Sequence, residues 1–503
     1  MLSYRKRRQR SCLTLCGKCL SVPDRERPEG PKETFRMLGE LAEGNVGMPA
    51  MVVNASSANE VSDPILQTKI HFGVLDSWRG VAALLVALFH LNILSPVYSL
   101  HFVRNSYLFV DFFFVLSGFV ISHSYGHRLG TLEGVGRFVM RRLGRLWPLH
   151  VVVLTAFVIV EGGRAISTAR GASFVNPPFT GATSLHSILT NLVFGQSFGI
   201  EQQLTWNPPS WSICAEFWTY LIFAAALLAG KTWLRRGRFG AESLLVALLL
   251  GSAGILVLFA QHGIDATYDL GFVRCIYGFM VGHLTYRLWQ ATSGLRFKTG
   301  FLEIAVVVAI AVYVSLAGRT GYSFLAPLMF AAVVFVFAFE AGPISGLMLN
   351  RGSVWLGRIS YSIYMWQAFI IFNFIDRAVA TLEKVTGQTF TATTPADAVL
   401  GKDAGKLIVF GGQVVPILAT LFFVALVIAV ASASYYLVEK PGQQLFARLG
   451  RGLRRHVVDR TNLFGEPVLL VGTLAPPLSP DPSGSFVLNQ DSQPVEPAEL
   501  VNH

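Results

Sequence analysis

One hydrophobic segment of the sequence carries an arginine and a histidine at a spacing that could support chemistry. The segment reads LDSWRGVAALLVALFHLNIL and contains Arg79 and His90. In a helix the two side chains would lie on nearly one face, about three turns and roughly 16 Å apart along the axis. An imidazole exchanges protons near neutral pH, which suits His90 for general-base catalysis. The alternatives are an interhelical hydrogen bond for His90 and, for Arg79, a side chain that reaches to a membrane interface.

A second group of basic residues could bind an anion. Arg137, Arg141, Arg142 and Arg145 occur close together in a segment that ends RRLGRLWP. The planar guanidinium group binds phosphate through two parallel hydrogen bonds, so these residues could hold the phosphates of a ligand. The alternative is the ordinary charge of a cytoplasmic loop.

A carboxylate also lies within a hydrophobic segment. Glu216 occurs in NPPSWSICAEFWTYL beside Trp211, Trp218 and Tyr220, and such aromatic residues are typical of a membrane interface. A buried carboxylate needs either a partner or a function. The sequence offers two interpretations, an ion pair with Arg274 or the orientation of a substrate.

Two further hydrophobic segments contain polar residues. In YLFVDFFFVLSGFVISHSY, Asp111 could pair with a cation or anchor the end of the segment, and the small Ser117-Gly118 pair favours close helix packing. The segment LGRISYSIYMWQAF presents Ser360, Tyr361, Tyr364 and Gln367. We expect these polar groups to face a cavity rather than lipid.

The composition determines what kind of fold must position these residues. Of 503 residues, 52% are hydrophobic and 14% charged, and the mean hydropathy is +0.50. Soluble domains carry about 25% charged residues, so a soluble protein is excluded, and the chain is too apolar to be disordered. An all-α, polytopic membrane helix bundle remains. The net charge of +11 then requires no nucleic acid as a partner, because basic residues mark the cytoplasmic loops of membrane proteins.

Ten segments approach the length of about 20 apolar residues that crosses a bilayer. They cover about 75–95, 107–126, 146–162, 211–229, 241–260, 268–288, 301–317, 323–340, 355–376 and 409–437. The shorter apolar stretch at 185–200 is interpreted as re-entrant or interfacial. Arg and Lys are concentrated in the loops that ten crossings would place inside, which predicts that both termini are cytoplasmic. The predicted organisation is a basic, largely disordered tail at 1–70, a ten-helix membrane domain at 71–445 and a largely disordered tail at 446–503.

Seven motifs, in order along residues 70–445, resemble the acyltransferase-3 family of integral membrane O-acyltransferases that act on glycans. The motifs are the Arg79 and His90 pair, FVDFFFVLSGF (109–119), Arg142 with Arg145, PSWSICAEFWTY (209–220), the Arg274 segment with Gly278 and Gly282, LGRISYSIYMW (356–366) and Glu439-Lys440-Pro441. The resemblance implies transfer of an acyl group, often acetyl, from cytoplasmic acyl-CoA to a hydroxyl of a cell-surface or lipid-linked glycan, lipopolysaccharide among them. It also implies a multi-pass protein of the bacterial inner membrane. Acyl-CoA would be a co-substrate, and no tightly bound cofactor and no metal is expected.

The resemblance assigns a role to each candidate residue. His90 would be the catalytic histidine, Arg79 its basic partner and Glu216 a further catalytic residue. Arg142 and Arg145 would bind the phosphates of CoA. Two routes stay open, because His90 could take the proton of the acceptor hydroxyl or could carry the acyl group itself.

One position departs from the family pattern. The family commonly has a histidine where this chain has Gln367, and a glutamine can form hydrogen bonds but cannot titrate. The alternative function is a multi-span transporter or channel for a small polar solute, since charged residues within a membrane also line transport pathways. The chain lacks the internal repeat that favours a transporter.

Overall fold

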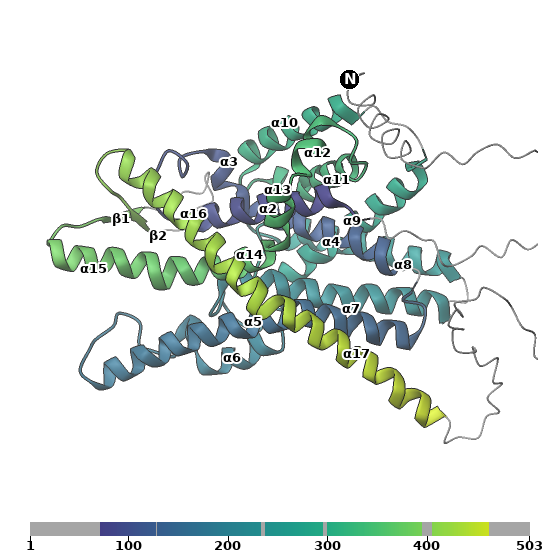
Figure 1. Ribbon diagram of the computed structural model, residues 1–503, viewed down its shortest axis with the longest axis horizontal. Coiled ribbons are helices and arrows are strands. Elements are labelled where there is room, and N and C mark those ends of the chain that lie inside the picture. The colour runs from purple at the N-terminus through teal and green to yellow at the C-terminus, as the bar shows by residue number, and fades with distance from the viewer. Residues whose placement is uncertain (1–70, 127, 233–236, 295–298, 395–404, 462–503) are drawn as a thin grey trace, which may run out of the picture. The chain divides into compact units, whose positions relative to one another are not determined.

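The computed structural model describes residues 71–126, 128–232, 237–294, 299–394 and 405–461 (Figure 1). The predicted tail at 1–70 and residues 462–503 of the second predicted tail lie outside the described residues. Most of the described chain is helical, as the hydropathy predicts, because a helix satisfies its own backbone hydrogen bonds within hydrocarbon.

The helices at the ten predicted spans, together with α17, make up the bundle. They are α2 (Gly73–His90), α4 (Phe109–Tyr125), α5 (Leu132–Ala169), α7 (Trp211–Thr232), α8 (Gly237–Phe259), α9 (Gly271–Thr292), α10 (Thr299–Ala317), α11 (Ala326–Phe337), α14 (Ser360–Ile370), α16 (Val414–Ser434) and α17 (Lys440–Thr461). The other helices are α3 (His101–Arg104), α6 (Leu185–Leu192), α12 (Pro343–Met348), α13 (Arg351–Arg358) and α15 (Asp376–Thr386). Single π-helical segments join α14 to α15 at Ile371–Ile375 and α16 to α17 at Tyr435–Glu439. Figure 1 shows α16 continuing in this way into α17.

Seven helical segments among the described residues are long and apolar enough to cross a bilayer. They are Gly73–His90, Ser106–Tyr125, Leu132–Ala169, Pro208–Gly230, Phe239–Phe259, Gly300–Ala317 and Val414–Arg451. Each coincides with one of the ten predicted spans, so the chain is a multi-pass membrane protein. Helices also occupy the three other predicted spans, where α9, α11 and α14 lie. The number of ten crossings and the cytoplasmic position of both termini stay predictions.

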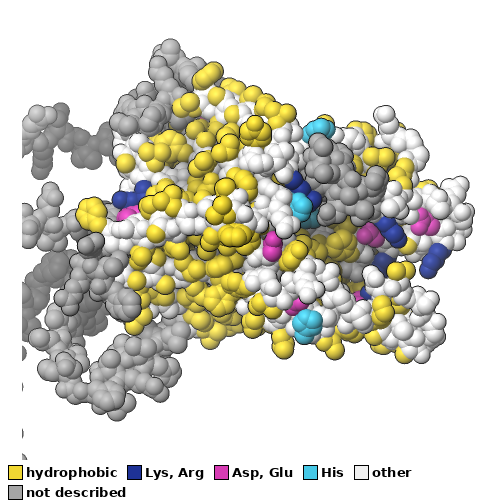
Figure 2. All heavy atoms as spheres, turned by 180° about the vertical axis from the view of Figure 1, so that it is seen from behind, with side chains coloured by type: hydrophobic (Ala, Val, Ile, Leu, Met, Phe, Trp, Pro, Cys, Tyr) yellow, Lys and Arg dark blue, Asp and Glu magenta, His cyan; other side chains and the backbone are white. Residues whose placement is uncertain are grey.

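The surface of the bundle is apolar where lipid would contact it. Leu250 and Val257 of α8, Val308 of α10 and Leu421 of α16 are all exposed. Figure 2 shows hydrophobic side chains over most of the middle of one face, with most charged side chains towards its two ends. Such a band matches the hydrocarbon layer of a membrane.

Contacts between connecting segments define two ends of the bundle. At one end, which we call the inner end, the backbone N–H of Val74 donates to Glu340 (2.9 Å) and Ser77 Oγ donates to the carbonyl of Met348 (2.7 Å). At the other, the outer end, Tyr107 Oη donates to the carbonyl of Gly318 (2.6 Å). Because α2 begins at the inner end, Arg79 lies nearer that end and His90 lies at the outer end.

Close contact between α4 and α9 lies at the centre of the bundle. A Cβ atom at Gly118 of α4 would clash with the backbone of Phe279, and one at Gly282 of α9 would clash with the backbone of Val115. Small residues permit this approach of two helix backbones. The packing role predicted for Gly118 is therefore confirmed, whereas Ser117 has a different role described below.

The all-α prediction is wrong in one detail. Strands β1 (Thr391–Thr394) and β2 (Gly405–Ile408) form a small antiparallel sheet. Helix α2 ends at His90 rather than near residue 95, and the segment after it runs beside β2, where Leu94 N–H donates to the carbonyl of Ile408 (2.8 Å). Backbone hydrogen bonds that the helix no longer supplies are made to the strand instead.

Two other boundaries also differ from prediction. The arginine-rich segment predicted as a loop is the first part of α5, whose N-cap Thr131 accepts a hydrogen bond from the N–H of Gly134. The apolar stretch 185–200, interpreted as re-entrant or interfacial, contains the short α6, which agrees with the expectation that it does not span a bilayer. Helix α17 continues to Thr461, past the predicted domain end at 445.

Candidate active site

His90 is the last residue of α2, and its ring nitrogens are in different environments. Nδ1 lies 2.9 Å from the carbonyl oxygen of Val86, one turn back in the same helix. A carbonyl can only accept, so Nδ1 carries the proton and donates it, and Nε2 keeps its lone pair. The neutral imidazole therefore presents a proton acceptor away from its own helix, as a general base requires.

Arg104 fixes the end of the helix that carries His90. Its Nη2 donates to the carbonyls of Leu88 and Phe89, both at 2.9 Å, and its guanidinium carbon lies 3.9 Å from the centre of the Tyr98 ring. A cation at a helix C-terminus satisfies carbonyls that have no partner within the helix. The sequence analysis did not identify Arg104, because in the sequence it is only an isolated charge in a short segment between two predicted spans.

Gln367 of α14 lies beside the imidazole of His90. Its side chain is fully buried, and neither atom of its amide has a partner at ordinary hydrogen-bond geometry within the described part of the chain, although the amide interacts with the imidazole. Ser360, Tyr361 and Tyr364 of α14 are also buried. These polar groups therefore lie inside the bundle rather than against lipid, and the cavity predicted beside them stays a prediction.

Arg79 belongs to a separate group of charges nearer the inner end. Its Nη1 lies 3.2 Å from Asp76, and the guanidinium also interacts electrostatically with Arg145 and Glu439. Glu439 accepts a hydrogen bond from Ser362 Oγ (2.8 Å). The partners of Arg79 show that its side chain faces protein and not only the membrane interface.

Arg145 and Glu216 extend this inner group of charges. Arg145 interacts electrostatically with Glu216, Glu439 and Asp76. The carboxylate of Glu216 accepts hydrogen bonds from Ser117 and Tyr220. The structure thus brings Arg79, Arg145 and Glu216 together and leaves His90 apart, at the far end of α2.

Of the two interpretations of Glu216, the ion pair with Arg274 is wrong. Arg274 instead binds Asp111, with Nη2 to Oδ2 at 2.7 Å and Nε to Oδ1 at 3.0 Å, and it lies 3.5 Å from Asp265. Asp111 and Glu216 both face the inside of the bundle, and helix packing decides which of them meets Arg274. The cation partner that the sequence allowed for Asp111 is confirmed.

The interfacial belt predicted around Glu216 is also wrong in part. Trp211 and Tyr220 are 6% and 2% exposed, so they lie inside the bundle rather than at the lipid boundary. Trp211 packs beneath the guanidinium of Arg274, and Tyr220 binds Glu216. Both aromatic residues support charged neighbours.

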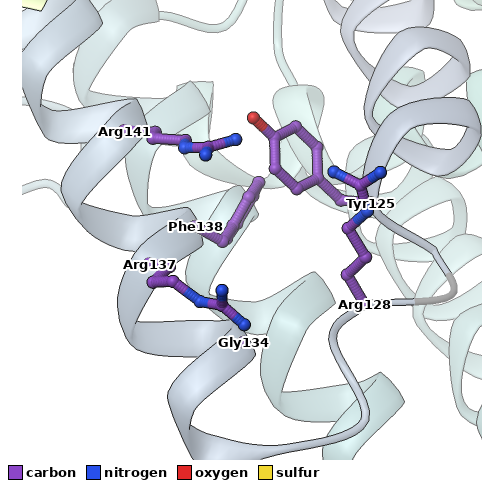
Figure 3. A pocket seen from close by; sticks show the side chains of 6 residues that line it. All are labelled: Tyr125, Arg128, Gly134, Arg137, Phe138 and Arg141. Carbon is purple, nitrogen blue, oxygen red and sulfur yellow. The ribbon is translucent and has the colours of Figure 1, made fainter. Parts of the chain in front are cut away.

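A basic pocket opens at the inner end. It has a volume of about 300 Å³, and its walls come from the end of α4, the turn after it and the first part of α5. The lining residues are Tyr125, Arg128, Gly134, Arg137, Phe138 and Arg141. Figure 3 shows the three arginines around the rings of Tyr125 and Phe138.

The two arginines predicted to bind phosphate do not line this pocket. Arg142 contacts Tyr125, a lining residue, from outside the pocket. Its Nη2 lies 3.3 Å from Tyr125 Oη, and its guanidinium lies over the Tyr125 and Tyr220 rings. Arg145 lies deeper, near Glu216. The helical arrangement of α5 causes this division, because residues 137 and 141 are one turn apart on one face. No feature of the sequence indicated that Arg128 would join them.

Comparison with known proteins identifies the family. A family model described as an acyltransferase domain, that of the acyltransferase-3 family, matches residues 72–437. The chain belongs to this acyltransferase family. The resemblance inferred from the seven motifs, and with it the assignment of the chain to the acyltransferases, is confirmed.

Curated relatives of this acyltransferase cover parts of the chain. The peptidoglycan O-acetyltransferase OatA of Listeria monocytogenes is 23% identical over 318 residues, which are 59% of this chain and 49% of the relative. The putative peptidoglycan O-acetyltransferase YrhL of Bacillus subtilis is 25% identical over 321 residues, 59% of this chain and 48% of the relative. The acyltransferase MdmB of Streptomyces mycarofaciens is 32% identical over 127 residues, 25% of this chain and 29% of the relative.

The match to the peptidoglycan enzymes is partial. The chain spans about half the length of these two relatives. No solved structure matches the chain.

Proposed function

We propose that the protein transfers an acyl group from cytoplasmic acyl-CoA to a hydroxyl of a cell-surface or lipid-linked glycan, and that this acyl group is acetyl. The bilayer is that of the bacterial inner membrane, with the inner end of the bundle in the cytoplasm. The observation that carries the proposal is the arrangement along α2, where a basic region lies near the inner end and a single imidazole lies at the outer end.

The basic pocket suits the nucleotide part of acyl-CoA. This donor carries three phosphate groups and an adenine ring. Arg128, Arg137 and Arg141 supply guanidinium groups for phosphate, and the rings of Tyr125 and Phe138 offer apolar faces for stacking. The pantetheine arm then runs from the pocket past Arg142 and Arg145 towards Arg79.

The inner charges hold the donor in place, and Glu216 acts on this group. The carboxylate of Glu216 is anchored by Ser117 and Tyr220 and faces Arg145. It therefore keeps Arg145 oriented, so that Arg79 and Arg145 present positive charge along the route of the donor. In this proposal Glu216 is a positioning residue rather than a group that contacts the acceptor.

His90 activates the acceptor at the outer end. Its Nε2 takes the proton of the sugar hydroxyl as that oxygen attacks the thioester carbon. The carbon–sulfur bond then breaks, and the proton passes from His90 to the departing thiolate of CoA. A glycan acceptor is supported by the names of the two peptidoglycan O-acetyltransferases to which the chain is similar.

The test is acyl transfer in vesicles. Protein in proteoliposomes is supplied with labelled acetyl-CoA, and lipid-linked or polymeric glycans are placed inside the vesicles. Labelled ester in the glycan that disappears in His90→Ala, but persists in the exposed-histidine variant His186→Ala, supports the proposal. Uptake of a solute without labelled ester would support a transporter and contradict it.

A further inference from the structure

The amide of Gln367 is buried without hydrogen-bond partners, which is energetically unfavourable for a polar group. The side chain is 0% exposed, and within the described residues its oxygen and its nitrogen both lack hydrogen bonds. An unsatisfied buried amide is unfavourable, so a group of this kind in a folded protein calls for an explanation. A reacting ligand that makes the missing hydrogen bonds is one explanation.

Helix packing directs this amide to His90. Ala83 and Ala87 of α2 belong to the same apolar cluster as Ile363 and Ile370 of α14. Gln367 lies one turn after Ile363, and His90 lies one turn after Ala87, so both continue the faces that meet. The amide and the imidazole are accordingly neighbours.

The other polar group near His90, the guanidinium of Arg104, holds the end of α2. Arg104 uses Nη2 for the carbonyls of Leu88 and Phe89, and one face of its guanidinium covers the Tyr98 ring. Gln367 has two amide hydrogens without an acceptor among the described residues. Arg104 Nε likewise lacks a hydrogen-bond partner among the described residues. Gln367 differs in that none of its polar atoms holds a backbone group in place, so its amide can turn to a substrate without loosening the end of α2.

We propose that Gln367 is a catalytic residue that donates a hydrogen bond from Nε2 to the thioester oxygen when that oxygen becomes negative. The proposal rests on the proposed function. As the acceptor hydroxyl attacks, a new carbon–oxygen bond forms, the carbonyl electron pair moves to oxygen, and Nε2 of His90 takes the proton. When the oxyanion collapses, the carbon–sulfur bond breaks and the proton leaves with the thiolate. Side-chain amides serve as such donors in other acyl transfers.

The test compares three substitutions at this position. Gln367→Met keeps the length of the side chain and removes both polar atoms, so kcat should fall about 100- to 1000-fold, with the KM for acetyl-CoA unchanged. Gln367→Glu replaces the donor by a negative charge and should be still less active. Gln367→His restores an N–H donor and should retain more activity than Gln367→Met.

A role in orienting His90 alone would give a different result. A carboxylate would hold the imidazolium, so Gln367→Glu would equal or exceed Gln367→Met and would extend activity to higher pH. That outcome overturns the proposal, as does wild-type kcat in Gln367→Met. The exposed-glutamine variant Gln388→Met is the matched control.

Folding and the underlying function are checked separately. If Gln367→Met lowers thermal stability below the wild type, the comparison of Gln367→Glu with Gln367→His, both polar, still decides between the two roles. Full activity of Gln367→Met together with loss in His90→Ala would contradict this inference and leave the proposed function intact. Absence of any transfer by the wild type would contradict the proposed function itself.

Discussion

Two pairs of buried polar side chains, Arg274 with Asp111 and His90 with Gln367, differ in how fully their hydrogen-bonding groups are used. Arg274 is 1% exposed and makes two hydrogen bonds to Asp111. Gln367 is 0% exposed and makes none that the described structure contains. Both pairs join helices across the bundle, so burial alone does not distinguish a structural pair from a catalytic one.

The difference indicates what each pair does. A buried ion pair whose donors and acceptors are satisfied holds α4 against α9, and no group is left to meet a substrate. An imidazole with one lone pair available, next to an amide without hydrogen bonds, has groups left for a ligand. The satisfaction of the polar atoms, rather than their charge, separates the two.

The largest effect is expected from loss of the imidazole. His90→Ala should reduce acyl transfer by about 100- to 10,000-fold, because general-base assistance is lost. The thermal unfolding of the purified protein in detergent should change little, because the hydrogen bond that His90 makes is within its own helix. Near-normal transfer rates would show that His90 has no catalytic role.

The opposite pattern is expected at the ion pair. Arg274→Met leaves the Asp111 carboxylate buried without its partner and should lower the free energy of unfolding by about 3–5 kcal/mol. The double variant Asp111→Leu with Arg274→Met should recover most of that loss, since neither charge is then buried alone. Thermal unfolding and activity per folded molecule are the measurements. A double variant as unstable as the single one would contradict this account.

A smaller effect is expected at the basic pocket. Replacing Arg137 and Arg141 together by Gln should raise the KM for acetyl-CoA about tenfold, because charge-assisted hydrogen bonds to phosphate are lost from exposed side chains. The kcat should stay within about twofold of the wild type, because neither residue contacts the reacting atoms. Arg170→Gln, an exposed arginine that follows α5 at the outer end, is the matched control. An unchanged KM would show that acetyl-CoA does not bind in this pocket.

The smallest effect is expected at the support of Glu216. Ser117→Ala removes one of two hydrogen bonds to the carboxylate and should raise the barrier to transfer by about 1 kcal/mol, a several-fold loss of rate. Glu216→Gln removes the charge that faces Arg145 and should lower the rate further. Steady-state kinetics of both variants provide the comparison. Equal rates for Ser117→Ala and Glu216→Gln would indicate that the charge has no role.

Much of this description was available from local sequence. Hydropathy and charge predict the helices of the bundle, because each membrane-spanning segment must itself be apolar and must make its own backbone hydrogen bonds. The spacing of Arg79 and His90 predicts one helix with both residues, and α2 contains them. The seven motifs also predict the family. Each of these conclusions depends on residues that are near one another in the chain.

Tertiary structure alone decided which distant residues meet. Arg274 pairs with Asp111, 163 positions away, and not with Glu216, because the glycines of α4 and α9 bring those two helices into contact. Gln367 reaches His90 because the apolar faces of α2 and α14 pack together. A polar residue within an apolar segment implies that it has a partner. Which of several residues becomes that partner depends on how whole helices pack, and no single segment encodes this packing.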